Sequence, residues 1–211
     1  TYQTNQNNDD NSSVPTVLPF INYKSGTYKY NQIDYENKYE FYNIFRDKNT
    51  SIHGKNQQKL SHRLNASREI IRYNSKITLN SEIYNQIFNT ETKLLEGNNY
   101  HSGTYYRFFP IMGLGVETPF KFKNSKSKFT VKPNAQLVLT PGISNTNKIS
   151  NEDSSNSNFT LENIKTLNRY SGTDKIDNSK RINYGISGYN DNLKIELSQS
   201  YEFTDNSNFH N

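Results

Sequence analysis

The fold is indicated most clearly by the sequence FTVKPNAQLVL at residues 129–139, in which apolar and polar side chains alternate. Successive side chains of a β-strand point to opposite faces, so one face of this segment would be apolar and the other polar. The apolar face reads Phe129, Val131, Ala135, Leu137 and Leu139, and the polar face reads Thr130, Lys132, Asn134 and Gln136. This pattern predicts a strand that lies between a hydrophobic environment and water.

The same period of two recurs along the chain and predicts an all-β antiparallel protein. Tyr28 and Tyr30 are out of phase with Ile33 and Tyr35, which indicates a bulge near Asn31. No helix longer than about two turns is expected. The eight predicted strands lie near residues 16–24, 27–45, 62–73, 76–88, 104–117, 128–140, 181–189 and 193–203.

The composition also favours strands. Only 31% of the 211 residues are hydrophobic, and no apolar run approaches the ~18 residues of a membrane helix, which excludes a helical membrane protein. The 16 Tyr and 12 Phe residues are typical of strands. A sheet with one apolar and one wet face explains this composition better than a soluble core does. The chain has no Cys, which excludes a disulfide or a thiolate metal site within it.

The predicted connections alternate between short and long. Short ones fall at 24–26, 73–76, 119–127 and 189–192, and long polar ones fall at 46–61, 89–103 and 141–180. In a meander this order places short turns at one rim and long loops at the other, as in outer-membrane barrels. We therefore predict an open segment of an up-and-down transmembrane β-barrel, about eight strands of a larger barrel, in the cell outer membrane. A secreted adhesin-like β-domain is the alternative that alternation leaves open.

Several motifs between residues 131 and 201 resemble those of one protein family. They read KPNAQLV at 132–138, NEDS at 151–154, NRYSGTDK at 168–175, RINYG at 181–185 and QSY at 199–201. In this order they resemble the LPS-assembly outer-membrane protein LptD, especially its alphaproteobacterial members, over about residues 15–205. Tyr170, Lys175 and Asp177 depart from the family's usual Phe, Arg and Glu. Lysine lacks the bidentate fork of arginine, which would weaken planar carboxylate pairing at position 175.

The resemblance implies a part of the outer-membrane translocon that assembles lipopolysaccharide into the outer leaflet. The chain would supply barrel wall, lumen lining and an extracellular loop. Its implied partners are lipopolysaccharide, the plug lipoprotein LptE, outer-membrane lipids and, through an N-terminal domain outside these residues, periplasmic LPS-bridge proteins. The chain would be a central barrel fragment, with a disordered polar lead-in at 1–14, the barrel domain at 15–205 and a polar tail at 206–211. A passive porin or receptor-type barrel is the alternative, because it shares the periodicity.

The long extracellular loop at 141–180 carries most of the candidate functional residues. Ile164, Leu167 and Tyr170 recur every three residues, which predicts an ordered segment at 161–176 folded back toward the lumen, with Arg169 paired to Asp174 or Asp153. The loop tips at 144–147 and 154–158 are polar enough to be disordered, and Gly172 is expected in a turn with positive φ. Arg107 and Gln136 lie opposite the apolar faces of their strands and are predicted to face the lumen. The loop and adjoining-strand residues singled out are Asn151, Glu152, Asp153, Ser154, Asn168, Arg169, Gly172, Asp174, Arg181, Tyr184 and Gly185.

No catalytic set, cofactor or metal site is predicted, and the chain is expected not to be an enzyme. The histidines at 53, 62, 101 and 210 have no partner at ligand spacing, and GLG at 113–115 lacks the third glycine of a nucleotide loop. Lysines at 121–128 are interleaved with phenylalanines. Nucleic-acid binding would fit only these residues, whereas a periplasmic turn beside anionic lipid headgroups fits the whole chain, so no nucleic acid is expected.

Overall fold

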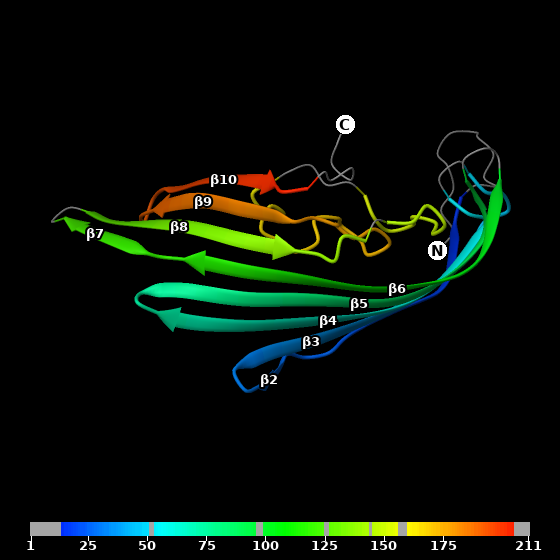
Figure 1. The fold of residues 1–211 in the computed structure, drawn as a ribbon, viewed down its shortest axis with the longest axis horizontal. Helices are drawn as coiled ribbons and strands as arrows, with labels where there is room; N and C mark the ends of the chain where they lie inside the picture. The colour runs from blue at the N-terminus through cyan, green and yellow to red at the C-terminus, as the bar shows by residue number, and fades with distance from the viewer. Residues whose placement is uncertain are drawn as a thin grey trace.

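The chain folds into one curved antiparallel β-sheet (Figure 1). The computed structural model describes residues 14–50, 53–95, 99–124, 127–143, 145–155 and 160–204. Within these ranges no helix is long and apolar enough to cross a membrane. The strands are β1 (Thr16–Lys24), β2 (Tyr28–Tyr30), β3 (Ile33–Phe45), β4 (Asn56–Arg72), β5 (Ser75–Leu94), β6 (Tyr100–Glu117), β7 (Phe120–Asn124), β8 (Ser127–Leu139), β9 (Arg181–Tyr189) and β10 (Lys194–Glu202).

The sheet has ten strands rather than eight, because two of its paths are interrupted. The predicted strand 27–45 is split by a turn, and residues 120–124 of the predicted connection 119–127 form a strand. Its order is β1-β3-β4-β5-β6-β8-β9-β10, with β2 paired to β3 and β7 paired to β8. Strands β1 and β2 therefore form one path along β3, and β6 and β7 form one path along β8. The second interruption contains Pro119, which has no N–H to donate to the ladder. The predicted all-β antiparallel meander is confirmed, but the single strand predicted at 27–45 is wrong, because residues 28–30 and 33–45 form two neighbouring antiparallel strands.

The bulge expected near Asn31 is wrong. Asn31 and Gln32 are the two central residues of a hairpin turn between β2 and β3, with φ of 48° and 65°. Positive φ at both positions matches the type I′ turn, whose twist suits adjacent antiparallel strands. The turn reverses the chain, so Tyr30 pairs with Ile33 and Tyr28 with Tyr35. This pairing explains the change of phase, and it moves the first short turn from 24–26 to 31–32.

Short and long connections lie at opposite rims of the sheet (Figure 1). The two-residue turns at 31–32 and 73–74 and the turn at 190–193 lie at one rim, and the long connections 46–55 and 140–180 lie at the other. The tip of the β7–β8 hairpin lies outside the described residues. At the long-loop rim β4, β5 and β6 extend beyond their predicted ends, and Asn56 pairs with Glu91 there. The alternation of apolar and polar side chains ends before the strand pairing does, because both faces of the sheet are polar in that region.

The sheet is open. Strands β1 and β10 are its two edges, and no pairing joins them among the described residues. The predicted open segment is therefore confirmed. We call the face that carries residues 141–180 the inner face and the opposite face the outer face. Unpaired edges leave a row of backbone N–H and C=O groups on β1 and β10 without partners in this sheet.

The two faces differ in chemistry as the alternation predicts. Leu79, Leu114 and Leu137 form one cross-strand row on the outer face, and Leu114 is 46% exposed. Tyrosine and phenylalanine side chains are exposed toward both rims of this face, as in an aromatic belt. Arg107, by contrast, lies on the inner face and is only 8% exposed. A sheet with exposed leucines and buried charges is the reverse of a soluble protein and suits a lipid-facing wall.

Replacing Leu137 by Lys should reduce the unfolding free energy of the full-length protein in lipid vesicles by ~2–4 kcal/mol, because the charge would face hydrocarbon. Replacing Asn134 by Lys is the matched control, because it puts the same charge on the inner face of the same strand. Urea titration of both variants measures the difference. Equal losses at the two positions would contradict a lipid-facing outer surface.

Candidate functional site on the inner face

Residues 141–180, which we call the inner loop, pack onto the inner face through a small apolar core. Leu167 and Ile176 of the inner loop are buried together with four wall residues, Tyr84, Phe109, Ile111 and Val138. Gly113 of β6 makes room for this contact, since a Cβ atom there would lie 2.6 Å from Leu167 Cδ2. Ile164 and Tyr170 are also buried. Each buried apolar side chain contributes roughly 1.5–3 kcal/mol to the docking of the inner loop.

Lys59 of β4 is the centre of a buried ionic cluster beneath the inner loop. Its Nζ lies 2.7 Å from Asp174 Oδ1, 2.7 Å from Asp153 Oδ2 and 2.9 Å from Glu40 Oε1. The Lys59 side chain is fully buried, and Nζ also lies 5.0 Å from the centre of the Tyr42 ring. Three carboxylates and an aromatic ring thus replace the water that the ammonium loses. Two of the carboxylates belong to the inner loop, so the cluster fixes the loop to the wall.

Asp153 and Asp174 also join the two halves of the inner loop. Asp153 Oδ1 accepts hydrogen bonds from the backbone N–H groups of Thr173 and Asp174, and Asp174 Oδ2 accepts one from the N–H of Glu152 at 2.7 Å. Burial alone would raise the pKa of Asp153, but the charge and hydrogen bond of Lys59 and the hydrogen bonds from Ser154 and the Asp174 N–H together lower that pKa. Burial raises the pKa of Asp174, and the nearby charge of Asp153 adds to this effect despite Lys59. The pKa values of the two carboxyl groups are thus shifted in opposite directions.

Gly172 is needed for close approach rather than for backbone conformation. A Cβ atom at this position would lie 2.3 Å from Asp153 Oδ1. The positive φ expected here is wrong, because Gly142 is the described glycine that adopts one. Only a residue without a side chain allows residues 172–174 to wrap around the Asp153 carboxylate. Asn168 holds the same bend from the other side, since its Nδ2 donates to the Gly172 carbonyl at 3.2 Å.

Arg46, just after β3, binds the inner loop through Glu152. The guanidinium forms a two-pronged ion pair with this carboxylate, and each side chain is 3% exposed. His53 Nδ1 lies 3.5 Å from the same carboxylate, and the Ser150 hydroxyl donates to it. Burial would raise the pKa of Glu152, but the nearby His53 ring and the hydrogen bonds from Arg46 and Ser150 hold it at about 2. The carboxylate is therefore ionised at every physiological pH.

Arg169 does not pair with Asp174 or Asp153, and that expectation is wrong. It donates to Asp177 at 2.5 and 3.2 Å and to Glu202 of β10 at 2.6 Å. The carboxylates of Asp174 and Asp153 form ion pairs with Lys59 instead. The N–H of Asp177 donates to Asn168 Oδ1, and this hydrogen bond holds Asp177 close to the neighbouring Arg169. Arg181 of β9 shares Asp177 at 3.0 Å and donates to the Thr166 carbonyl at 2.6 Å.

Arg107 and Gln136 bind the backbone of the inner loop from the wall. Arg107 donates to the carbonyls of Thr173 and Asp174 and to the Gln86 side chain. Gln136 donates to the Lys165 carbonyl at 3.0 Å and accepts a hydrogen bond from Asn183. These contacts follow from the positions of both residues on the inner face.

Other residues singled out in the sequence have local structural positions. Asn151 and Ser154 hydrogen-bond each other across a turn. Tyr184 lies on the outer face, where its hydroxyl donates to Gln199, and Gly185 allows close approach of the Leu197 carbonyl. Tyr184 and Gly185 therefore take no part in the inner cluster.

The loop tips are partly ordered. Asn145 hydrogen-bonds the backbone of Ile176 through both its amide atoms, and the Ser154 hydroxyl accepts from the N–H of Lys175. The expected disorder is therefore wrong at these positions. Ser144 and residues 156–158 lie outside the described residues, as do the lead-in at 1–13 and the tail at 205–211.

Lys59, Tyr42, Gln57 and Arg46 are site residues that the sequence did not single out. Gln57 donates to the Tyr42 hydroxyl and to the Ser150 carbonyl, each at 2.7 Å, so it joins the Lys59 cluster to the inner loop. The alternation of side chains along β4 could have identified two of them, because Gln57 and Lys59 continue the polar face of this strand. It was missed because β4 was expected to begin at residue 62.

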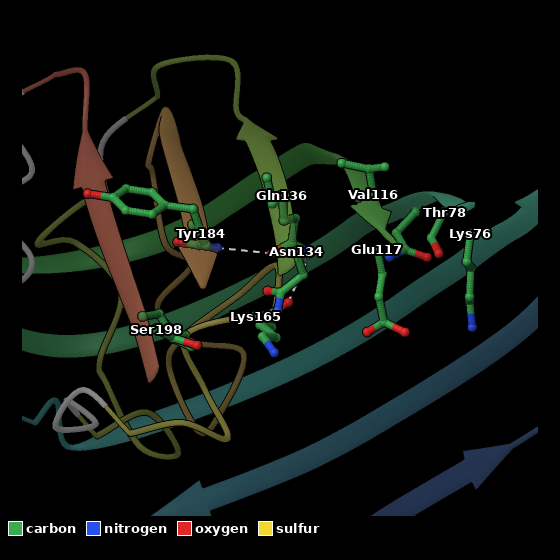
Figure 2. Close-up of a pocket in the computed structure, with 14 residues that line it drawn as sticks. Lys76, Thr78, Val116, Glu117, Asn134, Gln136, Lys165, Tyr184 and Ser198 are labelled. Carbon is green, nitrogen blue, oxygen red and sulfur yellow. Dashed lines mark hydrogen bonds between the residues drawn. The ribbon is translucent and has the colours of Figure 1, made fainter. Parts of the chain in front are cut away.

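A polar pocket of about 280 Å³ separates the inner loop from the wall toward the short-turn rim (Figure 2). Amide and hydroxyl side chains from β5, β8, β9 and β10 line it together with Lys165 of the inner loop. Lys165 Nζ is paired with Glu196 at 2.6 Å. The lining residues whose amides or hydroxyls lie on the inner face are Thr78, Asn80, Asn134, Gln136, Asn183 and Ser198.

In the ranges that the structure describes, no group of three or more His, Asp or Glu side chains is placed to hold a metal ion. Residues 1–210 match the model of the protein family described as LptD, LPS transport system D. No curated protein matches the chain.

Replacing Asp177 by Asn should destabilise the docked inner loop by about 3–5 kcal/mol, because two buried guanidinium groups lose their common carboxylate. The measurement is protease cleavage within residues 141–180 of the folded full-length protein, which should become much faster. Asp191→Asn is the control, since it removes an exposed carboxylate in the β9–β10 turn. A variant at 177 that resists protease as the wild type does would rule out this role.

Docking of the inner loop should weaken in acid through Glu152. The folded-state pKa is about 2 and the ordinary value is 4.5, so this stabilisation is present above pH 4.5 and is lost as the pH falls toward 2. Glu152→Gln should abolish that part of the acid dependence, because the amide does not titrate. Protease protection measured between pH 5 and pH 2 compares the two proteins. Identical profiles for wild type and variant would show that Glu152 does not contribute.

Proposed function

The chain belongs to the LptD family of LPS transport proteins, and we propose that it forms wall, lumen lining and extracellular lid of an outer-membrane translocon that assembles lipopolysaccharide into the outer leaflet. The family is a transport family rather than an enzyme family. The observation that carries the proposal is that buried ion pairs fix the inner loop to the polar inner face of a sheet whose outer face is apolar.

The wall role is supported by the outer face and by the edges of the sheet. Exposed leucines and aromatic residues suit a lipid-facing surface, and in lipid every backbone polar group must be satisfied. The free edges of β1 and β10 would therefore each pair with another strand of the full-length protein. On this proposal the described strands are a central part of a larger barrel, of alphaproteobacterial type.

The lid role is supported by the position of the inner loop. It covers the inner face near the long-loop rim, which is the extracellular side in outer-membrane barrels. Between the inner loop and the short-turn rim lies the amide-lined pocket, whose chemistry suits the hydroxyl groups of a saccharide. The saccharide of lipopolysaccharide would occupy the polar side, while the plug lipoprotein LptE and periplasmic bridge proteins would be the protein partners.

Replacing Asp174 or Arg169 by Ala in the full-length protein should raise outer-membrane permeability to large glycopeptide antibiotics. Either change removes one partner of a buried ion pair, at a cost of about 3–5 kcal/mol, and should release the lid. Antibiotic susceptibility of cells that carry each variant measures the effect.

Lys148→Ala is the control, because Lys148 is an exposed residue of the same loop. Barrel assembly must be checked by heat-modified mobility on gels. Unchanged permeability in a normally assembled variant would show that the inner loop does not act as a lid.

A further inference from the structure

Among the residues that the structure describes, two arginines on the outer face have no carboxylate partner. Arg68 is paired across the ladder with Leu79, which is 44% exposed on the outer face, so both side chains point to the same side. Arg72 lies four residues further along β4 and shares this parity. No ion pair involves either residue among the described residues. A cation on a lipid-facing surface is costly unless it reaches the headgroup region or an anion.

Arg68 donates one hydrogen bond from its guanidinium to a neighbouring side chain. Nη2 donates to the Gln32 side chain at 3.0 Å, while Nε is buried and has no hydrogen-bond partner among the described residues. The Arg72 guanidinium lies 5.1 Å from the centre of the Tyr73 ring, a contact that leaves its N–H groups free to bind an anion. Among the described residues, no carboxylate therefore neutralises either guanidinium.

The depth of the arginines is set by the short-turn rim. Arg68 is about 17 Å along the strand from the turn at 73–74, and Arg72 is directly beside that turn. Exposed Tyr28, Tyr30 and Tyr73 flank this level on β2 and on the turn, and exposed tyrosines mark the membrane–water interface. Two unpaired arginines at this level would therefore meet the phosphates of lipid headgroups.

An apolar groove of about 440 Å³ begins beside Arg68 and runs across five strands of the outer face, β3, β4, β5, β6 and β8. Arg68 is itself part of its lining, and so is the small side chain of Ala66. The groove leads from a cationic end near the short-turn rim into purely apolar surface. Its apolar lining includes Ile33, Leu79, Met112, Leu114, Leu137 and Leu139.

We propose that this surface binds one anionic glycerophospholipid, with its phosphate on Arg68 and Arg72 and an acyl chain in the groove. Arginine suits this role because its planar fork binds phosphate oxygens in pairs. The charge decides the occupant, since two cations without counter-ions match an anionic headgroup better than a zwitterionic one. The site goes beyond the transport role, but it rests on the proposed contact of the outer face with membrane lipid.

The test uses the full-length protein purified in detergent, with phosphatidylglycerol and phosphatidylcholine as probes in native mass spectrometry. Wild type should retain phosphatidylglycerol preferentially. Arg68→Gln/Arg72→Gln should weaken its binding about tenfold or more, because two charges near the headgroup are lost. Lys29→Gln/Lys194→Gln is the control, since it removes two charges at the same rim from the inner face and should leave binding unchanged.

A second variant, Ala66→Phe, fills the groove without changing charge and should also weaken retention of phosphatidylglycerol. Equal binding of the two lipids by wild type, or unchanged binding in both test variants, would overturn the proposal. Displacement of phosphatidylglycerol by lipid A at equal concentration would also overturn it. Binding of phosphatidylcholine by every variant would still support the membrane contact of the outer face, so failure of the site is distinguishable from failure of the proposed function.

Discussion

The contact of Lys59 with Asp174 and Asp153 is the interaction on which the inner face depends. Lys59 is fully buried, and a buried ammonium is tolerated only when anions and hydrogen-bond acceptors replace its hydration. Both aspartates belong to the inner loop, and each also accepts backbone N–H groups from the opposite half of that loop. The loop therefore cannot leave the wall without exposing a charge and unmaking its own fold.

The inner loop also acts as a strut across the sheet. At one end Arg46 and Lys59 connect it to β3 and β4, and at the other end Arg169 and Lys165 connect it to β10 through Glu202 and Glu196. Strands that lie far apart in the order of the sheet are thus joined across its inner face. A change in curvature would stretch these contacts, and buried ion pairs are costly to break one partner at a time. The inner loop therefore stabilises the curvature of this open sheet.

Alternation revealed the strands and their two faces because it records which side chains lie on the apolar outer face and which lie on the polar inner face. It could not reveal the ends of β4 and β5, where both faces are wet and the pairing of Asn56 with Glu91 has no hydrophobic signal. It could not choose the partner of Arg169 either, because Asp153, Asp174 and Asp177 are equivalent in the sequence. That choice depends on Lys59, which lies more than ninety residues away in the sequence and forms ion pairs with Asp153 and Asp174, so that Asp177 is left for Arg169. The close approach at Gly172 was likewise invisible, since it depends on the carboxylate of Asp153.

The two kinds of cation on the inner face are suited to different geometries. Lys59 is a point charge surrounded by Glu40, Asp153 and Asp174, which approach from different directions and could not all meet a planar group. Arg169 and Arg181 instead share the single carboxylate of Asp177, and their planar forks reach Glu202 and a backbone carbonyl as well. Lysine and arginine therefore suit different arrangements of carboxylates. The docked position of the inner loop thus depends on the directions of its ion pairs as well as on their charges. A loop held in this way moves as a unit or remains in place. The amide-lined pocket and a second pocket of about 360 Å³ beside Lys165 and Leu167 are then parts of the described inner face that are open to a passing molecule.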